Sequence, residues 1–254
     1  MSREITYPPL DVPKPVAEGV WVVDSGPQRV LGLSLPVRMT VLRLRDGGLF
    51  LHSPTRHTPA LQAALAALGP VRHLVAPDTA HWSHVSPWRK AEPGAKFWAA
   101  PGVVDRARGQ GVELIADGVL SNLAPPDWAG EIEQAWFRGP GFTEVAFHHR
   151  PSRTLLLTDI VQAMEPDRLP LGTRLLAGAL GNATPEGATP AYLRAILGLR
   201  RQENRAAAEG LLALSPERVI FAHGAPFAAE GAARLRQALA WLLDQGKPRS
   251  GGST

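Results

Sequence analysis

The sequence has 254 residues, no cysteine, and 27 Lys and Arg against 23 Asp and Glu, which gives a formal net charge of +4. The lack of cysteine excludes disulfides and thiolate metal ligands and is compatible with a reducing, cytoplasmic location, which is our expectation. The basic residues are scattered and not interleaved with aromatic ones, so we expect no nucleic-acid partner. No apolar run approaches the roughly 20 residues of a membrane span, and the N-terminus lacks the apolar core of a signal peptide, so we expect no membrane partner.

The length and apolar content fit one domain with a substantial core, and we predict a single domain over residues 1–245. Within it, residues 1–18 contain several prolines and are expected to form an extended arm across the surface. Residues 246–254 are rich in Gly and Ser and are expected to form a flexible tail.

The first part of the chain predicts antiparallel strands. β-branched and apolar runs occupy residues 20–23, 37–44 and 49–52, and Asp46-Gly47-Gly48 between the last two is a hairpin turn signal. A helix follows, because Thr58 can cap it, Pro59 suits its first position, and Gly69-Pro70 ends an apolar stripe. A short apolar run over residues 71–76 then predicts a buried strand.

The rest of the chain alternates between strand and helix patterns. Residues 160–190 are irregular, with helical pieces, and are expected to form a cover over a site. We predict further strands at residues 96–100, 132–137, 143–149, 153–158 and 218–222, and further helices at residues 102–108, 191–214 and 232–243.

Two histidines, His81 and His84, follow the strand at residues 71–76 and are three positions apart. If the chain becomes helical after Pro77, positions i and i+3 share a face, and both imidazoles can point at one metal ion. For an isolated pair, the simpler interpretation is a helix start whose histidines bind backbone groups. The metal hypothesis therefore depends on ligands supplied elsewhere in the chain.

Further candidate ligands stand where predicted strands end. His148 and His149 end one strand and point to opposite faces, so at most one of them can serve. The position relative to Pro151-Ser152 selects His149. Asp159 and His223 each follow an apolar run, although Asp159 can also be a helix cap and His223 a turn residue. Such nitrogen and oxygen ligands suit one or two zinc ions, and also iron or manganese. The full candidate set is His81, His84, His149, Asp159 and His223.

These motifs, in this order, resemble those of the metallo-β-lactamase-like hydrolases. The first motif of that superfamily is His-x-His-x-Asp-His-x-Gly; residues 79–86 keep His81 and His84 but have Thr79 in place of the first His and Ser83 in place of the Asp. The later segments HRPS, LLLTD and IFAHG, which begin at residues 149, 155 and 220, match better. The segments RMTV, LHSP and FHHRPSRTLLLTD, which begin at residues 38, 51 and 147, also resemble an uncharacterised branch of the superfamily, a domain of unknown function.

The resemblance implies an α+β fold, a four-layer αβ/βα sandwich with mostly antiparallel and mixed sheets and with helices outside. It also implies one metal position at His81, His149 and Asp159 and another at His84, His223 and Asp159. Asp159 would be catalytic as the bridging carboxylate, and Asp78 is a candidate to replace the lost Asp that orients water. The implied activity is metal-dependent hydrolysis of a small-molecule substrate by a metal-activated water.

Two other functions stay open at this point. Because Thr79 and Ser83 replace two expected ligands, the chain can instead be a non-catalytic member that binds a ligand or partner. A redox or oxygen-handling di-metal protein is a third possibility, against which the reduced number of carboxylates argues. We expect a monomer or a homodimer.

Overall fold

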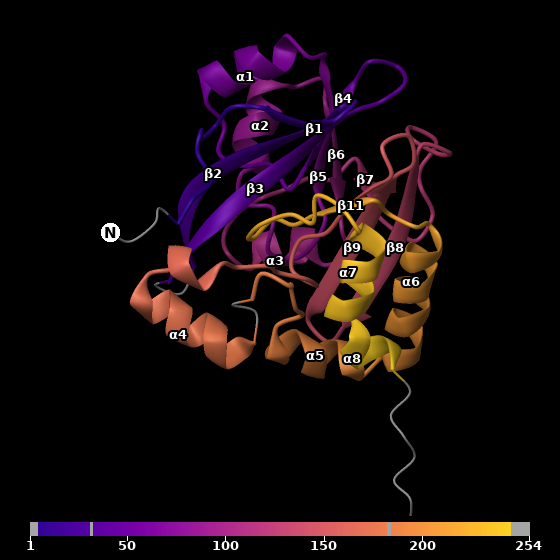
Figure 1. Ribbon diagram of the computed structural model, residues 1–254. Coiled ribbons are helices and arrows are strands. Elements are labelled where there is room, and N and C mark those ends of the chain that lie inside the picture. The colour runs from indigo at the N-terminus through magenta and orange to yellow at the C-terminus, as the bar shows by residue number, and fades with distance from the viewer. Residues whose placement is uncertain (1–4, 31–32, 182–183, 245–254) are drawn as a thin grey trace, which may run out of the picture.

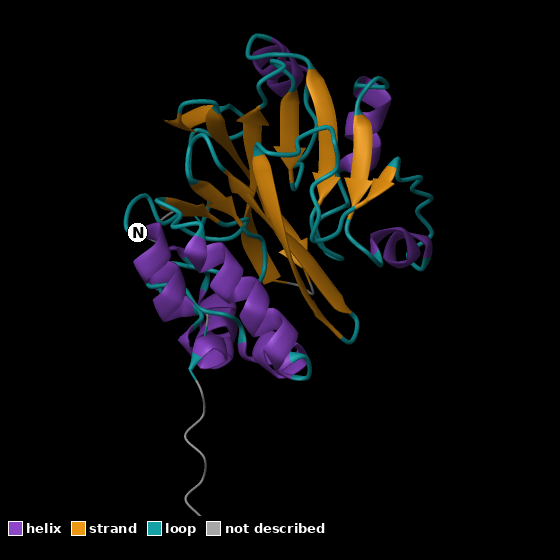
Figure 2. Cartoon of the chain, turned by 90° about the vertical axis from the view of Figure 1, so that its right-hand side faces the viewer, coloured by secondary structure: helices purple, strands orange, loops and turns teal. Residues whose placement is uncertain are grey.

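The computed structural model describes residues 5–30, 33–181 and 184–244. Two β-sheets pack together, and helices cover the outer face of each, as Figure 1 shows. Figure 2 shows the strands between the two groups of helices. The predicted four-layer sandwich is thus confirmed, with an α+β content in mixed sheets.

The larger sheet is formed by the N-terminal part of the chain. Strands β1 to β4 are antiparallel neighbours, whereas β4 to β7 are parallel. The chain therefore opens with an antiparallel meander, as the hairpin turn signal predicts. In spatial order the strands are β1 (Lys14–Ala17), β2 (Val20–Val30), β3 (Leu33–Arg43), β4 (Leu49–His52), β5 (Val71–Ala76), β6 (Lys96–Ala99) and β7 (Gly118–Val119).

Helices α1 (Pro59–Ala66), α2 (Val85–Ala91) and α3 (Val103–Arg108) belong to this half. The predicted cap of α1 is present, because the Thr58 hydroxyl accepts a hydrogen bond from the Leu61 N–H at 3.1 Å. Leu61 and Leu65 are fully buried, so the apolar stripe of α1 packs into the core.

The second sheet has the order β11 (Arg218–Ile220), β10 (Thr154–Leu156), β9 (Phe142–His149) and β8 (Ile132–Gly139). Strand β10 is parallel to β11 and antiparallel to β9. Helices α5 (Ala191–Gly198), α6 (Arg201–Ala213), α7 (Gly231–Ala238) and α8 (Ala240–Leu243) belong to this half, and α4 (Leu171–Leu180), after a short 3₁₀ turn at Pro166–Arg168, contacts β3.

Aromatic side chains join the two sheets. Phe50 on β4 and Phe147 on β9 are fully buried, and their ring centroids are 5.5 Å apart in an edge-to-face arrangement. Both rings belong to the core cluster that packs the two sheets together.

Several predicted elements differ from the observed ones. Part of the expected N-terminal arm forms the edge strand β1, which pairs with β2. The helix predicted over residues 191–214 is divided into α5 and α6 around Leu199 and Arg200, and the one over residues 232–243 is divided into α7 and α8 at Leu239. The predicted tail, residues 246–254, lies outside the described residues.

Within the described part of the chain, no helix is long and apolar enough to cross a membrane.

Candidate metal site

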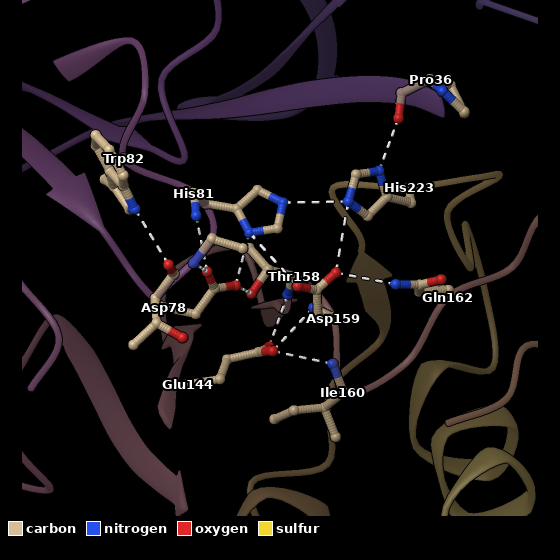
Figure 3. Close-up of polar contacts among 12 residues, drawn as sticks. Pro36, Asp78, His81, Trp82, Glu144, Thr158, Asp159, Ile160, Gln162 and His223 are labelled. Atoms are coloured by element: carbon tan, nitrogen blue, oxygen red, sulfur yellow. Dashed lines mark hydrogen bonds and ion pairs between the residues drawn. The ribbon is translucent and has the colours of Figure 1, made fainter. Parts of the chain in front are cut away.

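Three loops, which follow β5, β10 and β11, bring His81, Asp159 and His223 together (Figure 3). One ligand atom from each side chain can be chosen so that all three lie within 4.8 Å of one another. The sequence places these residues far apart, and they meet because the carboxyl ends of β5, β10 and β11 reach the same edge of the sandwich. The arrangement is a potential metal site of two nitrogens and one oxygen.

His81 is held by the loop that contains Asp78. One oxygen of the fully buried Asp78 carboxylate accepts from the backbone N–H groups of Ala80 and His81, at 2.6 and 2.8 Å. The other oxygen accepts from the His81 Nδ1, at 2.7 Å, and from the Thr158 hydroxyl, at 2.5 Å. Since Nδ1–H is used in this way, Nε2 is the nitrogen of His81 that can bind a metal ion in place of a proton. Both oxygens of Asp78 are occupied by these four contacts, so the carboxylate positions His81 instead of orienting a water, which is the role predicted for it from the sequence.

His223 is oriented from the larger sheet. Its Nδ1 donates to the Pro36 carbonyl at 2.7 Å, which leaves the Nε2 lone pair facing His81. The neighbouring Arg38 is buried, pairs with Asp24 at 2.7 Å, and donates to the carbonyls of Phe221 and Gly224 at 3.1 and 2.6 Å. Strand β3 thus holds both the ring of His223 and the loop that carries it.

Asp159 is positioned by a second buried carboxylate. Glu144 on β9 accepts from three successive backbone N–H groups, those of Thr158, Asp159 and Ile160, at 2.7, 2.8 and 2.9 Å. These bonds fix the turn after β10. The side-chain amide of Gln162 also donates to Asp159 Oδ1 at 2.9 Å, which orients the carboxylate.

The two free imidazole nitrogens require a positive charge between them. The Nε2 atoms of His81 and His223 are 3.2 Å apart, and two lone pairs at that distance repel each other unless a proton or a metal cation lies between them. His223 Nε2 is 3.5 Å from Asp159 Oδ1. Ligands about 2.0–2.1 Å from a tetrahedral zinc ion are roughly 3.3 Å apart, so the residues present fit such an ion.

The surroundings favour positive charge at this position. Although burial alone acts in the opposite direction, the carboxylates of Asp78 and Asp159 raise the pKa of His81 to about 10. Burial likewise opposes ionisation of Asp159, but His81 and His223 lower its pKa to about 2. Burial raises the pKa of Glu144 to about 8, and the charges of Asp78 and Asp159 act in the same direction.

A cavity of about 190 Å³ opens over the three residues. It is smaller than the roughly 300–1,000 Å³ typical of sites that enclose a whole ligand, so it fits a reacting group better than an entire substrate. Polar side chains on its wall can contact such a group, and they are Gln28, Ser53, Thr55, Ser83, His84, Gln162 and Tyr192.

His84 lies on this cavity wall but is not one of the three converging ligands. His81 and His84 are the first and last residues of the turn at residues 81–84, which precedes α2 (Val85–Ala91). The two histidines therefore do not share a helix face, and the spacing argument does not describe how His81 reaches the site.

The structure does not bring His149 to this group, which corrects the prediction that it supplies a further imidazole. His149 is at the far end of β9, opposite Thr154, whereas Asp159 follows the other end of β10. At about 3.3 Å per residue, the five residues from Thr154 to Asp159 span roughly 16 Å. His149 lines a different cavity.

Sequence reasoning missed the groups that position the ligands, above all Glu144 and Arg38. A signal was present for Glu144, because a charged residue inside the apolar run at residues 142–147 must be buried and therefore needs partners. Arg38 lies in a segment already noted for its resemblance to a family, but only the fold shows that it contacts the loop of His223.

Comparison with solved structures defines the class of fold. The chain is similar to a metallo-β-lactamase from Pontibacter korlensis, with 13% identity, 92% of this chain and 99% of that chain covered, and a TM-score of 0.59. The metallo-β-lactamase from Hirschia baltica is 14% identical, with 91% of this chain and 96% of that chain covered and a TM-score of 0.59. The metallo-β-lactamase FIM-1 from Pseudomonas aeruginosa, in the mono-zinc form, is 12% identical, with 95% of this chain and 96% of that chain covered and a TM-score of 0.60. The protein has the metallo-β-lactamase fold.

The sequence places the chain more narrowly. Residues 17–189, more than half of its length, match the model of the family described as Domain of unknown function (DUF4336), and the chain belongs to that family. No curated protein sequence matches it.

Proposed function

We propose that this protein is a metal-dependent hydrolase that holds a single ion, most suitably zinc, with His81, Asp159 and His223. The observation that carries the proposal is the convergence of three ligand atoms, within 4.8 Å of one another, on the wall of a cavity, with the Nε2 atoms of His81 and His223 3.2 Å apart. The fold shared with metallo-β-lactamases supports it, as does the mono-zinc form of FIM-1, in which one ion is present.

A divalent ion bound here would polarise the scissile group and lower the pKa of a water. The chain's own residues fix the donors before any ligand arrives. Asp78 and the Pro36 carbonyl hold the two Nδ1–H groups, so neither ring has to reorient when the ion binds. Glu144 keeps Asp159 in place through three backbone N–H groups.

The cavity dimensions indicate how a substrate would be held. Its reacting group would enter the small cavity, and the remainder would extend toward the rim, where the half-exposed Tyr192 lies. Ser53, Ser83 and His84 offer polar contacts on the wall. A small-molecule ester, amide, lactone or phosphodiester meets these requirements.

The decisive experiment is elemental analysis of the purified protein, followed by chelation and titration with zinc, iron and manganese. We expect about one ion per chain, a melting temperature that rises on adding the metal, and hydrolysis of chromogenic esters or phosphodiesters that chelation removes and metal restores. His223→Ala and Asp159→Asn should lose both metal and activity, whereas His57→Ala, outside the site, should keep both.

A protein that takes up none of these metals, and whose melting temperature does not respond to them, would contradict the proposal. That result would favour the alternative of a non-catalytic member of the fold that binds a ligand or partner through the same cavity.

A further inference from the structure

A second cavity, of about 550 Å³, lies at the opposite end of the β9–β10 hairpin from the candidate metal site. His149, which the metal site does not use, contributes to its wall together with Glu131 and the arginines Arg43, Arg45 and Arg150. This volume is within the usual range for a small-ligand site, roughly 300–1,000 Å³.

The hydrogen bonds around His149 determine which of its nitrogens carries a proton. The Thr154 hydroxyl donates to the Ser152 carbonyl at 3.2 Å, so its oxygen is free to accept from the Ser152 hydroxyl at 2.9 Å. The Ser152 oxygen must then accept from His149 Nδ1 at 2.7 Å. The lone pair of His149 therefore lies on Nε2. Burial lowers the pKa of His149, which agrees with a neutral ring.

The Nε2 atom of His149 faces a second acceptor. His149 is 2% exposed, and its Nε2 has no hydrogen-bond partner within the described part of the chain. Oε1 of Glu131 lies 3.7 Å from His149 Nε2, and Glu131 is itself 6% exposed. The other Glu131 oxygen accepts from the Arg45 backbone N–H at 3.2 Å. A buried imidazole lone pair and a carboxylate oxygen are both acceptors, so a donor is missing between them.

Three arginines, Arg43, Arg45 and Arg150, place positive charge around the opening of this cavity. The guanidinium of Arg43 lies over the ring of Trp21, 5.6 Å from its centroid, and Arg150 pairs with Glu133 at 2.7 Å. The guanidinium of Arg45 has no ion-pair or hydrogen-bond partner among residues 5–30, 33–181 and 184–244. Glu18 adds one negative charge to the wall. Three cations around the opening disfavour a bare metal ion at the His149–Glu131 pair and favour an anionic group.

We propose that this cavity binds a small molecule that carries both an ammonium group and an anionic group, such as a phosphate or a carboxylate. The ammonium group donates to His149 Nε2 and to Glu131 Oε1, and the anionic group is held by Arg45 with Arg43 and Arg150. This site is separate from the candidate metal site, and its occupancy does not depend on metal.

Isothermal titration calorimetry of the full-length protein tests the proposal with phosphoethanolamine as the probe. Inorganic phosphate and ethanolamine, each of which supplies only one of the two groups, are titrated for comparison, and zinc is titrated into the Asp159→Asn variant. We expect phosphoethanolamine to bind at least about tenfold more tightly than either half-ligand, because two charge-assisted contacts are made together. Chelation of metal, or the Asp159→Asn change, should leave this binding unaltered.

Substitutions identify the cavity as the place of binding. Arg45→Ala removes an exposed guanidinium and should weaken phosphoethanolamine binding about tenfold, whereas Arg236→Ala, an equal change of charge on α7, should not. His149→Leu should abolish the preference for phosphoethanolamine over phosphate, and circular dichroism checks that this variant folds. Equal affinity for phosphate alone, tight zinc binding by Asp159→Asn, or no binding of phosphoethanolamine would each overturn the proposal.

Discussion

The two ends of the β9–β10 hairpin each place a histidine in a similar hydrogen-bonding arrangement, but they differ in the charge around it. At each end an imidazole donates Nδ1–H to a fixed acceptor, which leaves Nε2 for another group: His81 donates to Asp78, and His149 donates to Ser152. Around His81 are the acidic groups of Asp78, Glu144 and Asp159, whereas the cavity beside His149 is lined by three arginines with Glu18 and Glu131. The ring geometry alone therefore does not specify a metal site; the surrounding charge determines whether a cation or a mixed-charge ligand is favoured.

The sharpest test of this difference is to remove one histidine from each end. His223→Ala should weaken zinc binding by more than about 100-fold, because a direct ligand is lost, whereas His149→Ala should leave the metal content unchanged. Inductively coupled plasma mass spectrometry of the purified variants measures both. Loss of metal in His149→Ala would show that the two ends do not act separately.

The second test concerns the backbone at Gly224, directly after His223. Gly224 has φ of +92°, and a Cβ at this position would lie 2.1 Å from the Ala163 carbonyl oxygen. Gly224→Ala should therefore destabilise the fold by about 2–3 kcal/mol in urea unfolding, because left-handed strain and a backbone clash add together.

Gly210→Ala is the matched control for that test. Gly210 is within α6, and nothing lies within 4 Å of a Cβ built on it. The same chemical change should here stabilise the protein by about 0.5–1 kcal/mol. An equal effect at both glycines would show that His223 does not need the observed turn.

A smaller effect is expected when the support of His81 is removed without changing a ligand. Asp78→Asn preserves volume but removes the charge that holds His81 Nδ1–H, so zinc affinity should fall by about 10–100-fold. Competition with a chromophoric chelator measures the change. Unaltered affinity would mean that Asp78 serves folding only.

The smallest predicted effect is in the pH dependence of stability, and it arises from His148 in the same hairpin. His148 is 3% exposed, and neither ring nitrogen has a hydrogen-bond partner among the described residues. Burial lowers the pKa of His148 to about 4, and the positive charge of Arg150 acts in the same direction. The unfolded state, with a pKa near 6.5, binds more protons between these values, so stability should fall as the pH decreases from about 6.5 to 4.

His148→Phe removes this titration. Relative to its value at pH 7, the stability of the wild-type protein at pH 5 should decrease by about 1–2 kcal/mol more than that of the variant. Urea unfolding at both pH values gives the difference. Parallel pH profiles would show that water reaches the His148 ring.

The sequence predicted most of the strands because these depend on local patterns. The runs at residues 71–76 and 143–149, the Thr58 cap and the strand-end positions of Asp159 and His223 are all local in this sense. The placement of His149 could not be predicted in the same way. Strands β9 and β10 are antiparallel, and His149 pairs with Thr154 at the end of the pair away from Asp159. The sequence spacing between His149 and Asp159 does not show whether the two residues lie at the same end of the pair or at opposite ends.

The supporting contacts were also beyond local reasoning. Glu144 is 14 to 16 residues from the N–H groups it binds, Asp78 is 80 residues from Thr158, and Arg38 is 183 residues from Phe221. Such contacts are decided by how the two sheets pack. A buried charge in the sequence indicates that a partner exists without identifying it.

The origin of the three ligand atoms has a mechanical consequence for the sandwich. His81 leaves the larger sheet, Asp159 and His223 leave the smaller one, and the His223 ring is bonded back to Pro36 at the opposite layer. A cation at this edge would be bound by residues from both sheets, so the two sheets could not separate without releasing it. Metal binding and the packing of the two sheets would then be coupled, so removing the metal would first weaken the contact between the sheets at this edge.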